Sequence, residues 1–210
     1  MADPKRIVAE GYDRIAERYA AWTGDAWAGP RARYGSVLWQ RLPEGARVLE
    51  LGCGTGVPTT RELARRFAVT GVDSSARSIA LARHNVPDAT FRHGDMASLA
   101  LPAASFDAVV AFYSIIHVPR QEHPRLLRDI AAWLRPGGLL VTTMGAGATK
   151  NGYEADWHGA PMYWSHFDSA TNRDLVRQAG LRLLEATELV DDEDGVPVTF
   201  LWVVAQQREG

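Results

Sequence analysis

The sequence predicts an α/β fold with a seven-stranded, mostly parallel sheet, helices on both faces and an antiparallel strand in a C-terminal hairpin. Short apolar runs alternate with helical patterns through the middle of the chain, and parallel strands need such helical crossovers. The alternation ends in two successive strand patterns joined by an acidic turn, which predicts a hairpin whose last strand runs against the others. A length of 210 residues suits one domain, so we expect residues 1–210 to fold as a single unit.

Two helical patterns open the chain, and we expect them to form an N-terminal cap over residues 1–43. Apolar residues at spacings of four, three and four from Val8 to Tyr19 predict an amphipathic helix over residues 4–22. A second helix is expected over residues 26–42, where apolar residues again recur at helical spacing.

Strand and helix patterns then follow one another as far as Gly180, a residue type suited to the end of a helix. Strands are expected over residues 47–51, 68–73, 89–95, 106–113, 138–144, 181–190 and 197–207. Helices are expected over residues 76–85, 123–134 and 169–179.

One long segment, residues 145–167, has no regular pattern, and its residues do not reveal its conformation. Connections of this length inside a compact domain are usually lids or binding loops. The segment holds two tryptophans, two tyrosines and two histidines, and it begins at the C-terminal end of an expected parallel strand. Open sheets of this kind bind ligands at that edge, so we expect the segment to face the substrate.

The composition excludes several classes of function. A formal net charge of −2 without a basic run argues against a nucleic-acid partner. Cys53 is the single cysteine, which excludes an internal disulfide and a cysteine-rich zinc cluster. No signal peptide or apolar run of membrane-spanning length is present, so we expect a cytoplasmic protein without a membrane partner, either a monomer or a homodimer.

The stretch VLELGCGTGV places Gly52, Gly54 and Gly56 between an expected strand and the region after it. Glycines at such a turn let a nucleotide approach the main chain. Asp73 ends the next strand, nineteen residues after Gly54, where a carboxylate can accept both ribose hydroxyls. Glu50, two residues before the first glycine, suits a cation better than a pyrophosphate. The chain lacks the Tyr-x-x-x-Lys pair of short-chain dehydrogenases, and no lysine follows the glycines for phosphate transfer.

Five motifs identify the family that this sequence resembles. They are VLELGCGTG, VTGVDSS, HGDMASL, FDAVVAFYSIIHV and LRPGGLLVTT, and they span residues 47–143. In this order and spacing they resemble the class I S-adenosylmethionine-dependent methyltransferases, and more narrowly the bacterial enzymes that act on small molecules. The resemblance implies a Rossmann-like sheet, S-adenosylmethionine as cofactor, S-adenosylhomocysteine as product, and methyl transfer to an oxygen or nitrogen of a small molecule.

The resemblance also implies roles around the glycine loop. Gly52 and Gly54 approach the methionine and ribose portions of the cofactor, and Glu50 attracts the ammonium of its amino-acid tail. Asp73 holds the ribose through charge-assisted hydrogen bonds. Cys53 belongs to the same loop and is expected to fill space beside the cofactor rather than to act as a nucleophile.

Further cofactor contacts are implied on the neighbouring strands and the first helix. Asp95 accepts from the adenine amino group, and the backbone of Met96 meets the ring edge. Phe112 offers its carbonyl to the ammonium, and Tyr19 closes over the methionine end. Ser74 stands where the family usually has a large apolar residue, so stacking on the adenine must come from another residue.

The implied chemistry is an in-line displacement at the sulfonium methyl group. A nucleophile that carries a proton needs a base, and a histidine suits a hydroxyl or phenol. His117, a few residues after the fourth strand, is the first candidate, its alternative being a hydrogen-bonded residue at a helix start. His158 and His166, in the aromatic segment, are the other candidates. We expect no metal, because Asp156 and His158 make a poor ligand set.

Aromatic side chains are expected to form the wall of the substrate pocket: Tyr12, Tyr113, Trp157, Tyr163 and Trp164. Tyr12 also fits the apolar stripe of the first helix. Two alternatives remain open at this point. The chain could methylate a protein or nucleic acid, although it lacks the Asn/Asp-Pro-Pro-Tyr/Phe signature of amino-directed nucleic-acid enzymes. It could also bind the cofactor for a purpose other than methylation.

Overall fold

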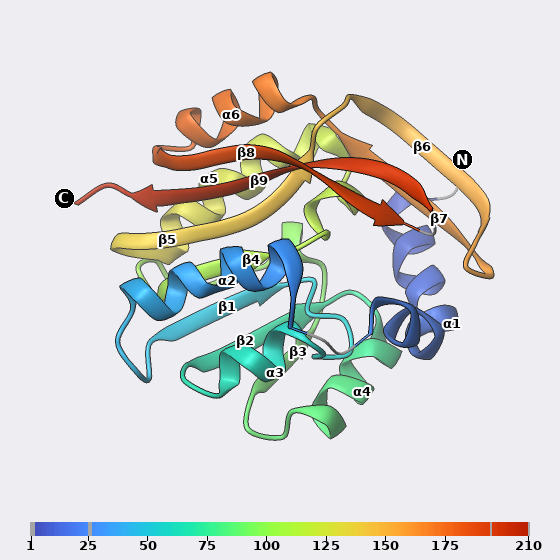
Figure 1. The fold of residues 1–210 in the computed structure, drawn as a ribbon, viewed down its shortest axis with the longest axis horizontal. Helices are drawn as coiled ribbons and strands as arrows, with labels where there is room; N and C mark the ends of the chain where they lie inside the picture. Colours follow the sequence, from blue (N-terminus) through green and yellow to red (C-terminus); the bar gives the residue numbers. More distant parts are fainter. Residues whose placement is uncertain (1–2, 25–26, 194, 210) are drawn as a thin grey trace.

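The computed structural model describes residues 3–24, 27–193 and 195–209 (Figure 1). The expected start of the second helix at Ala26, Asp194 of the acidic turn and the ends of the expected domain at residues 1, 2 and 210 lie outside the described residues.

A seven-stranded sheet in the order β3-β2-β1-β4-β5-β9-β8 forms the centre of the molecule. Its strands are β1 Arg47–Leu51, β2 Ala68–Asp73, β3 Thr90–His93, β4 Phe106–Ala111, β5 Leu134–Gly145, β8 Leu181–Glu193 and β9 Val196–Gln207. The first five strands pair in parallel, and β9 runs antiparallel to both β5 and β8. The predicted fold class is therefore confirmed, including the antiparallel strand of the C-terminal hairpin.

Within residues 3–24, 27–193 and 195–209, six α-helices accompany this sheet. They are α1 Pro4–Thr23, α2 Gly29–Arg41, α3 Thr59–Ala64, α4 Ala76–Asn85, α5 His123–Trp133 and α6 Ser169–Gln178. The apolar residues of α5 and α6 pack on one face of the sheet, and those of α2 and α3 pack on the other face. None of the helices within the described ranges combines the length and apolarity that crossing a membrane would require.

Residues 145–167, for which the sequence showed no regular pattern, have regular secondary structure over most of their length. The segment forms a second, two-stranded antiparallel sheet of β6 Thr149–Trp157 and β7 Ala160–His166. Its turn holds two residues with positive φ, His158 at 50° and Gly159 at 95°. Most residues of β6 are exposed, so this strand lacks the period-two apolar pattern that marks a half-buried strand.

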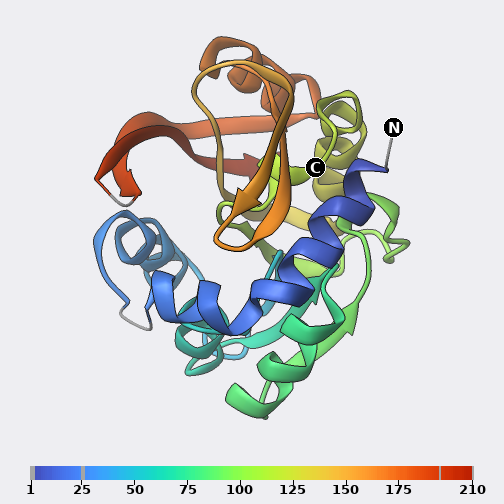
Figure 2. The same cartoon turned by 90° about the vertical axis from the view of Figure 1, so that its right-hand side faces the viewer.

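The hairpin of β6 and β7 lies against α1 (Figure 2). Met162 and Tyr163 of β7 form an apolar cluster with Val8 and Ile15 of α1. This cluster fixes α1 beside the carboxyl ends of the parallel strands. The strand order reverses between β1 and β4, and ligands bind in open α/β sheets at such a reversal.

Candidate cofactor and substrate site

The glycine loop lies at the carboxyl end of β1 in a conformation that side chains disfavour. Gly52 and Gly54 have φ angles of 76° and 54°. A Cβ atom at Gly52 would lie 2.2 Å from the Cβ of Ser114, so that position has room only for glycine. The loop can therefore present its main chain directly to a ligand.

Asp73, the last residue of β2, ties two loops together. Its Oδ2 accepts a hydrogen bond from the Gly54 amide at 2.8 Å, and its Oδ1 accepts one from the Ser75 amide at 2.9 Å. Burial raises the pKa of the Asp73 carboxyl above its usual range. A carboxylate oxygen has two lone pairs, so each oxygen keeps one for a ligand hydroxyl.

A cavity of about 570 Å³ opens between α1, the glycine loop and the ends of β2, β3 and β4. This volume suits a nucleoside with a short tail. The predicted residues on its wall are Tyr12, Tyr19, Gly52, Gly54, Asp73, Ser74, Asp95, Met96, Phe112, Tyr113 and His117. The chain thus gathers nearly all of the expected cofactor residues around one space.

Two expected cofactor residues, Glu50 and Cys53, lie behind this wall. The Glu50 side chain is buried, and its Oε2 accepts a hydrogen bond from the Thr60 hydroxyl at 2.5 Å. Burial raises the pKa of Glu50 to about 8. The Cys53 thiol packs beneath α4, and burial raises its pKa well above the usual range, which agrees with a space-filling role.

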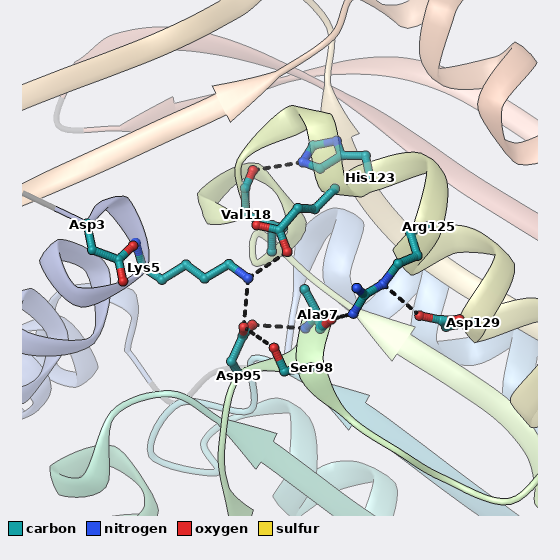
Figure 3. A network of polar contacts seen from close by, with 10 residues as sticks. Asp3, Lys5, Asp95, Ala97, Ser98, Val118, His123, Arg125 and Asp129 are labelled. Carbon is teal, nitrogen blue, oxygen red and sulfur yellow. Dashed lines mark hydrogen bonds and ion pairs between the residues drawn. The ribbon is translucent and has the colours of Figure 1, made fainter.

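At the other end of the cavity, Asp95 is held by three groups of the chain (Figure 3). Its Oδ1 accepts from the Ala97 amide at 2.9 Å, and its Oδ2 accepts from the Ser98 hydroxyl at 2.9 Å and from Lys5 Nζ at 2.8 Å. Burial opposes ionisation, but these three hydrogen bonds outweigh it and lower the pKa of Asp95. Lys5 Nζ also donates to Glu122 at 2.6 Å and so connects α1 to the segment before α5. No motif in the sequence indicated this role of Lys5.

A second cavity of about 720 Å³ adjoins the first on the side of the β6–β7 hairpin. Both cavities have Tyr12, Tyr19, Tyr113 and His117 in their walls. The rest of the second wall includes Trp22, Trp157, Trp164, His166, Ile116 and Phe200, with Arg31, Asp191, Asp192 and Glu193 as charged members. The first cavity, which has the size of a nucleoside, therefore adjoins the second, largely aromatic cavity at three tyrosines and a histidine.

His117 stands at this junction in a defined tautomer. Its Nδ1 lies 2.8 Å from the Tyr163 carbonyl oxygen, which can only accept, so Nδ1 carries the proton. Nε2 is then an acceptor, and the Tyr12 hydroxyl donates to it at 3.0 Å. Burial lowers the pKa of His117 to about 4, so the ring is neutral at pH 7.

Two expected site residues do not line the substrate cavity. The Tyr163 hydroxyl donates to Asn151 Oδ1 at 2.9 Å, and its ring faces a separate hollow between α1 and the hairpin. His158 lies in the hairpin turn, where its ring packs on Trp22 and Trp157 with ring centroids 4.7 Å apart in each pair. The alternation of side chains along the hairpin, which the sequence did not reveal, directs both residues away from the cavity.

No cluster of three or more histidine, cysteine, aspartate or glutamate side chains suited to a metal ion is found in residues 3–24, 27–193 and 195–209. His166, the remaining histidine candidate, lines the substrate cavity, and its Nδ1 donates to the Gly147 carbonyl at 2.7 Å.

Comparisons with known proteins agree with this geometry. The sequence profile of a family described as "Methyltransferase domain" matches residues 48–138, from β1 into β5. A trans-aconitate 2-methyltransferase of Deinococcus radiodurans is 37% identical over 170 residues, which make up 74% of this chain and 60% of that protein. The chain belongs to the class I S-adenosylmethionine-dependent methyltransferases. It spans about half the length of the curated family members that it matches.

Solved structures share the fold of this family over almost their whole length. A 1,6-didemethyltoxoflavin-N1-methyltransferase of Burkholderia thailandensis, with bound S-adenosylhomocysteine, superposes with a TM-score of 0.73 at 20% identity and covers 100% of this chain and 92% of its own. The [4+2]-cyclase SpnF superposes with a TM-score of 0.74 at 20% identity, covering 96% and 95% of the two chains. The expected Rossmann-like sheet is thereby confirmed.

Proposed function

We propose that the chain binds S-adenosylmethionine in the first cavity and transfers its methyl group to an oxygen or nitrogen of a small molecule in the second. The observation that carries this proposal is the junction of the two cavities at Tyr12, Tyr19, Tyr113 and His117. A methyl donor and an acceptor placed on either side of this junction would meet in a space walled by aromatic rings.

The residues present fit the cofactor. Gly54, where a Cβ atom would have no neighbour within 4 Å, leaves open space at the cavity wall, and Asp73 holds its carboxylate on the same wall for a ribose diol. Asp95 lies at the opposite end of the wall, where an adenine amino group would find an ionised acceptor. S-Adenosylmethionine supplies a methyl group on a positively charged sulfur, and the faces of Tyr19 and Tyr113 suit such a cation.

His117 is the proposed proton acceptor, acting through the Tyr12 hydroxyl. Its tautomer leaves Nε2 free to accept, and Tyr12 already donates to that atom. The nucleophile would give its proton to the Tyr12 oxygen while Tyr12 passes its own proton to Nε2. Burial lowers the pKa of His117 to about 4 and makes it a weak base, and the positive charge of a bound sulfonium would weaken it further. Loss of that charge during transfer would raise its affinity for a proton.

The charges of the second cavity narrow the substrate class. Asp191, Asp192 and Glu193 lie on one side of its wall, against the single guanidinium of Arg31. This balance disfavours a tricarboxylate such as the trans-aconitate named for the Deinococcus relative. A neutral or basic ring compound suits the aromatic wall better, in the manner of the 1,6-didemethyltoxoflavin bound to the Burkholderia protein.

A screen with a metabolite library tests this function. The full chain is incubated with S-adenosylmethionine and pooled compounds, trans-aconitate among them, and products are read by mass spectrometry. We expect a neutral or basic ring compound to become one methyl group heavier while S-adenosylhomocysteine forms. Methylation of trans-aconitate alone would overturn the substrate class. Binding of the cofactor without transfer to any compound would favour another reaction, such as that named for the [4+2]-cyclase with this fold.

A further inference from the structure

Arg31, in the first turn of α2, is partly buried, and among the described residues its guanidinium group contacts an aromatic ring rather than an acidic side chain. Its Nε atom is buried and makes no hydrogen bond. Across residues 3–24, 27–193 and 195–209, no hydrogen bond or ion pair reaches its guanidinium group. Arg33, two residues further along the same helix, pairs with Glu185 at 2.7 Å. Desolvating a guanidinium without an acceptor is unfavourable, so the position of Arg31 indicates a missing anion.

The place of Arg31 in the fold limits where this anion can lie. Its guanidinium carbon is 5.0 Å from the centre of the Tyr113 ring, on the wall of the second cavity. Its positive charge acts on Tyr19 and Tyr113, which line both cavities, and on the buried carboxyl of Glu50. Arg31 therefore stands on the wall of the second cavity beside the junction with the first, close enough for its charge to act on the buried Glu50.

Two sources of an anion are compatible with this place: the cofactor and the methyl acceptor. An acceptor with a free negative charge would also face Asp191, Asp192 and Glu193 on the same cavity wall, and these would repel it. The carboxylate of an amino-acid tail is covalently joined to an ammonium, which the acidic groups attract. A zwitterion can therefore pair with Arg31 through its carboxylate without net repulsion from the acidic residues on the same cavity wall.

We propose that Arg31 binds the α-carboxylate of the amino-acid tail of the cofactor, an inference that rests on the proposed function. Arg31 then provides the positive charge for the carboxylate end of the zwitterion. The sequence motifs did not point to Arg31, because it lies in the N-terminal helices, outside the motif region of residues 47–143.

Calorimetric titration with two ligands tests the proposal without methyl transfer. The ligands are S-adenosylhomocysteine and its decarboxylated form, S-adenosyl-3-thiopropylamine, which keeps the amine and lacks the carboxylate. In the wild-type chain we expect the decarboxylated ligand to bind at least about tenfold more weakly. In Arg31→Met we expect S-adenosylhomocysteine to weaken by a similar factor and the decarboxylated ligand to change less than about twofold. Arg31→Lys should recover part of the loss.

Arg33→Met is the matched control, because it removes an exposed arginine from the same helix and should change neither affinity. Equal weakening of both ligands in Arg31→Met would overturn the proposal, since the arginine would then act through folding or cavity shape. Unchanged binding of both ligands would overturn it as well. If Arg31→Met does not fold, equal affinity of the two ligands in the wild-type chain still contradicts it. Failure of the wild-type chain to bind either ligand would instead contradict the proposed function.

Discussion

The Tyr12 hydroxyl donates a hydrogen bond to Nε2 of His117 across 3.0 Å, and so joins the N-terminal helix to the turn after β4. The same imidazole donates from Nδ1 to the Tyr163 carbonyl of the hairpin. One ring thus connects three elements that surround the junction of the two cavities. This arrangement favours the neutral form of His117. It also directs Nε2, the accepting nitrogen, at the Tyr12 hydroxyl.

Removing the Tyr12 hydroxyl should raise the pKa of His117. Its hydrogen bond stabilises the neutral imidazole, so Tyr12→Phe takes away part of the preference for the unprotonated form. Nitrogen-15 NMR of the histidine side chains across pH 4 to 8 measures this directly. We expect the wild-type ring to carry its proton on Nδ1 and to titrate near pH 4, and the variant to titrate higher. Tyr153→Phe, on the exposed face of β6, should leave the titration unchanged. A wild-type His117 that titrates near 6.5 would contradict the assignment.

Glu50 should make the free protein less stable as pH rises. Its folded-state pKa of about 8 lies above the value of 4.5 for an exposed glutamate. The protonated form therefore stabilises the fold below pH 4.5, and this contribution is lost as pH rises through 8. Glu50→Gln can still accept from Thr60 and cannot ionise. We expect it to be more stable than the wild-type chain at pH 8 by on the order of 4 kcal/mol, and nearly equal at pH 4.5.

Urea unfolding of both chains at several pH values supplies the measurement for Glu50. Glu154→Gln, an exposed substitution on β6, serves as the control and should follow the wild-type curve. Parallel pH profiles of the wild-type and Glu50→Gln chains would show that burial does not raise the pKa of this carboxyl.

His123 should make the protein less stable as pH falls, whereas Glu50 makes it less stable as pH rises. Burial lowers its pKa to about 4, below the value of 6.5 for an exposed histidine, and its Nε2 donates to the Val118 carbonyl at 2.9 Å. The stability that comes from the neutral ring is complete above pH 6.5 and is lost as pH falls towards 4. His123→Gln keeps an N–H donor and cannot be protonated. The difference in free energy of unfolding between His123→Gln and the wild-type chain is measured at pH 7 and at pH 4.5. We expect it to shift in favour of the variant by about 1–2 kcal/mol between these two pH values.

Between pH 4.5 and 6.5, Glu50 and His123 change the free energy of unfolding in opposite directions. The contribution of His123 is therefore obtained by comparing His123→Gln with the wild-type chain at each pH. His84→Gln, an exposed residue of α4, is the control. If His123→Gln and wild type lose stability equally on acidification, His123 is not the buried neutral group described here.

Lys5 should hold the first turns of α1 against the adenine end of the cavity. Its ammonium bridges Asp95 and Glu122, and both ion pairs are only partly exposed. Lys5→Met keeps the length of the side chain and removes the charge. We expect faster amide hydrogen exchange in the first turns of α1 and a loss of about 1 kcal/mol or less in global stability. Arg6→Met, which removes an exposed cation from the next position, should leave that exchange unchanged.

The predictions that succeeded depend on local patterns with a buried side. The bounds of β1 and α4 match the expected residues, because each places apolar residues at the spacing of its own element. Asp168, directly before α6, caps this helix by accepting from the Thr171 amide. Residues of the glycine loop and of the β2 and β3 ends meet at one cavity because parallel strands share a carboxyl edge.

The misses have a common physical origin in contacts between distant segments. The β6 strand is stabilised by pairing with β7 and by the packing of β7 on α1, so its own residues show no apolar period. Lys5 and Arg31 acquire their significance only when α1 and α2 are placed beside the sheet. No local sequence pattern reports that placement. For the same reason, it could not be predicted that the Tyr163 ring faces away from the substrate cavity.

Titration of the chain with S-adenosylhomocysteine, in the wild-type form and as Asp73→Asn, tests the central claim most directly. The claim is that the first cavity holds the nucleoside of this cofactor through the Asp73 carboxylate. We expect saturable binding of one molecule per wild-type chain, weakened at least about tenfold in Asp73→Asn and unchanged in the exposed control Asp88→Asn. The absence of binding to the wild-type chain, together with saturable binding of NADH, would contradict the account.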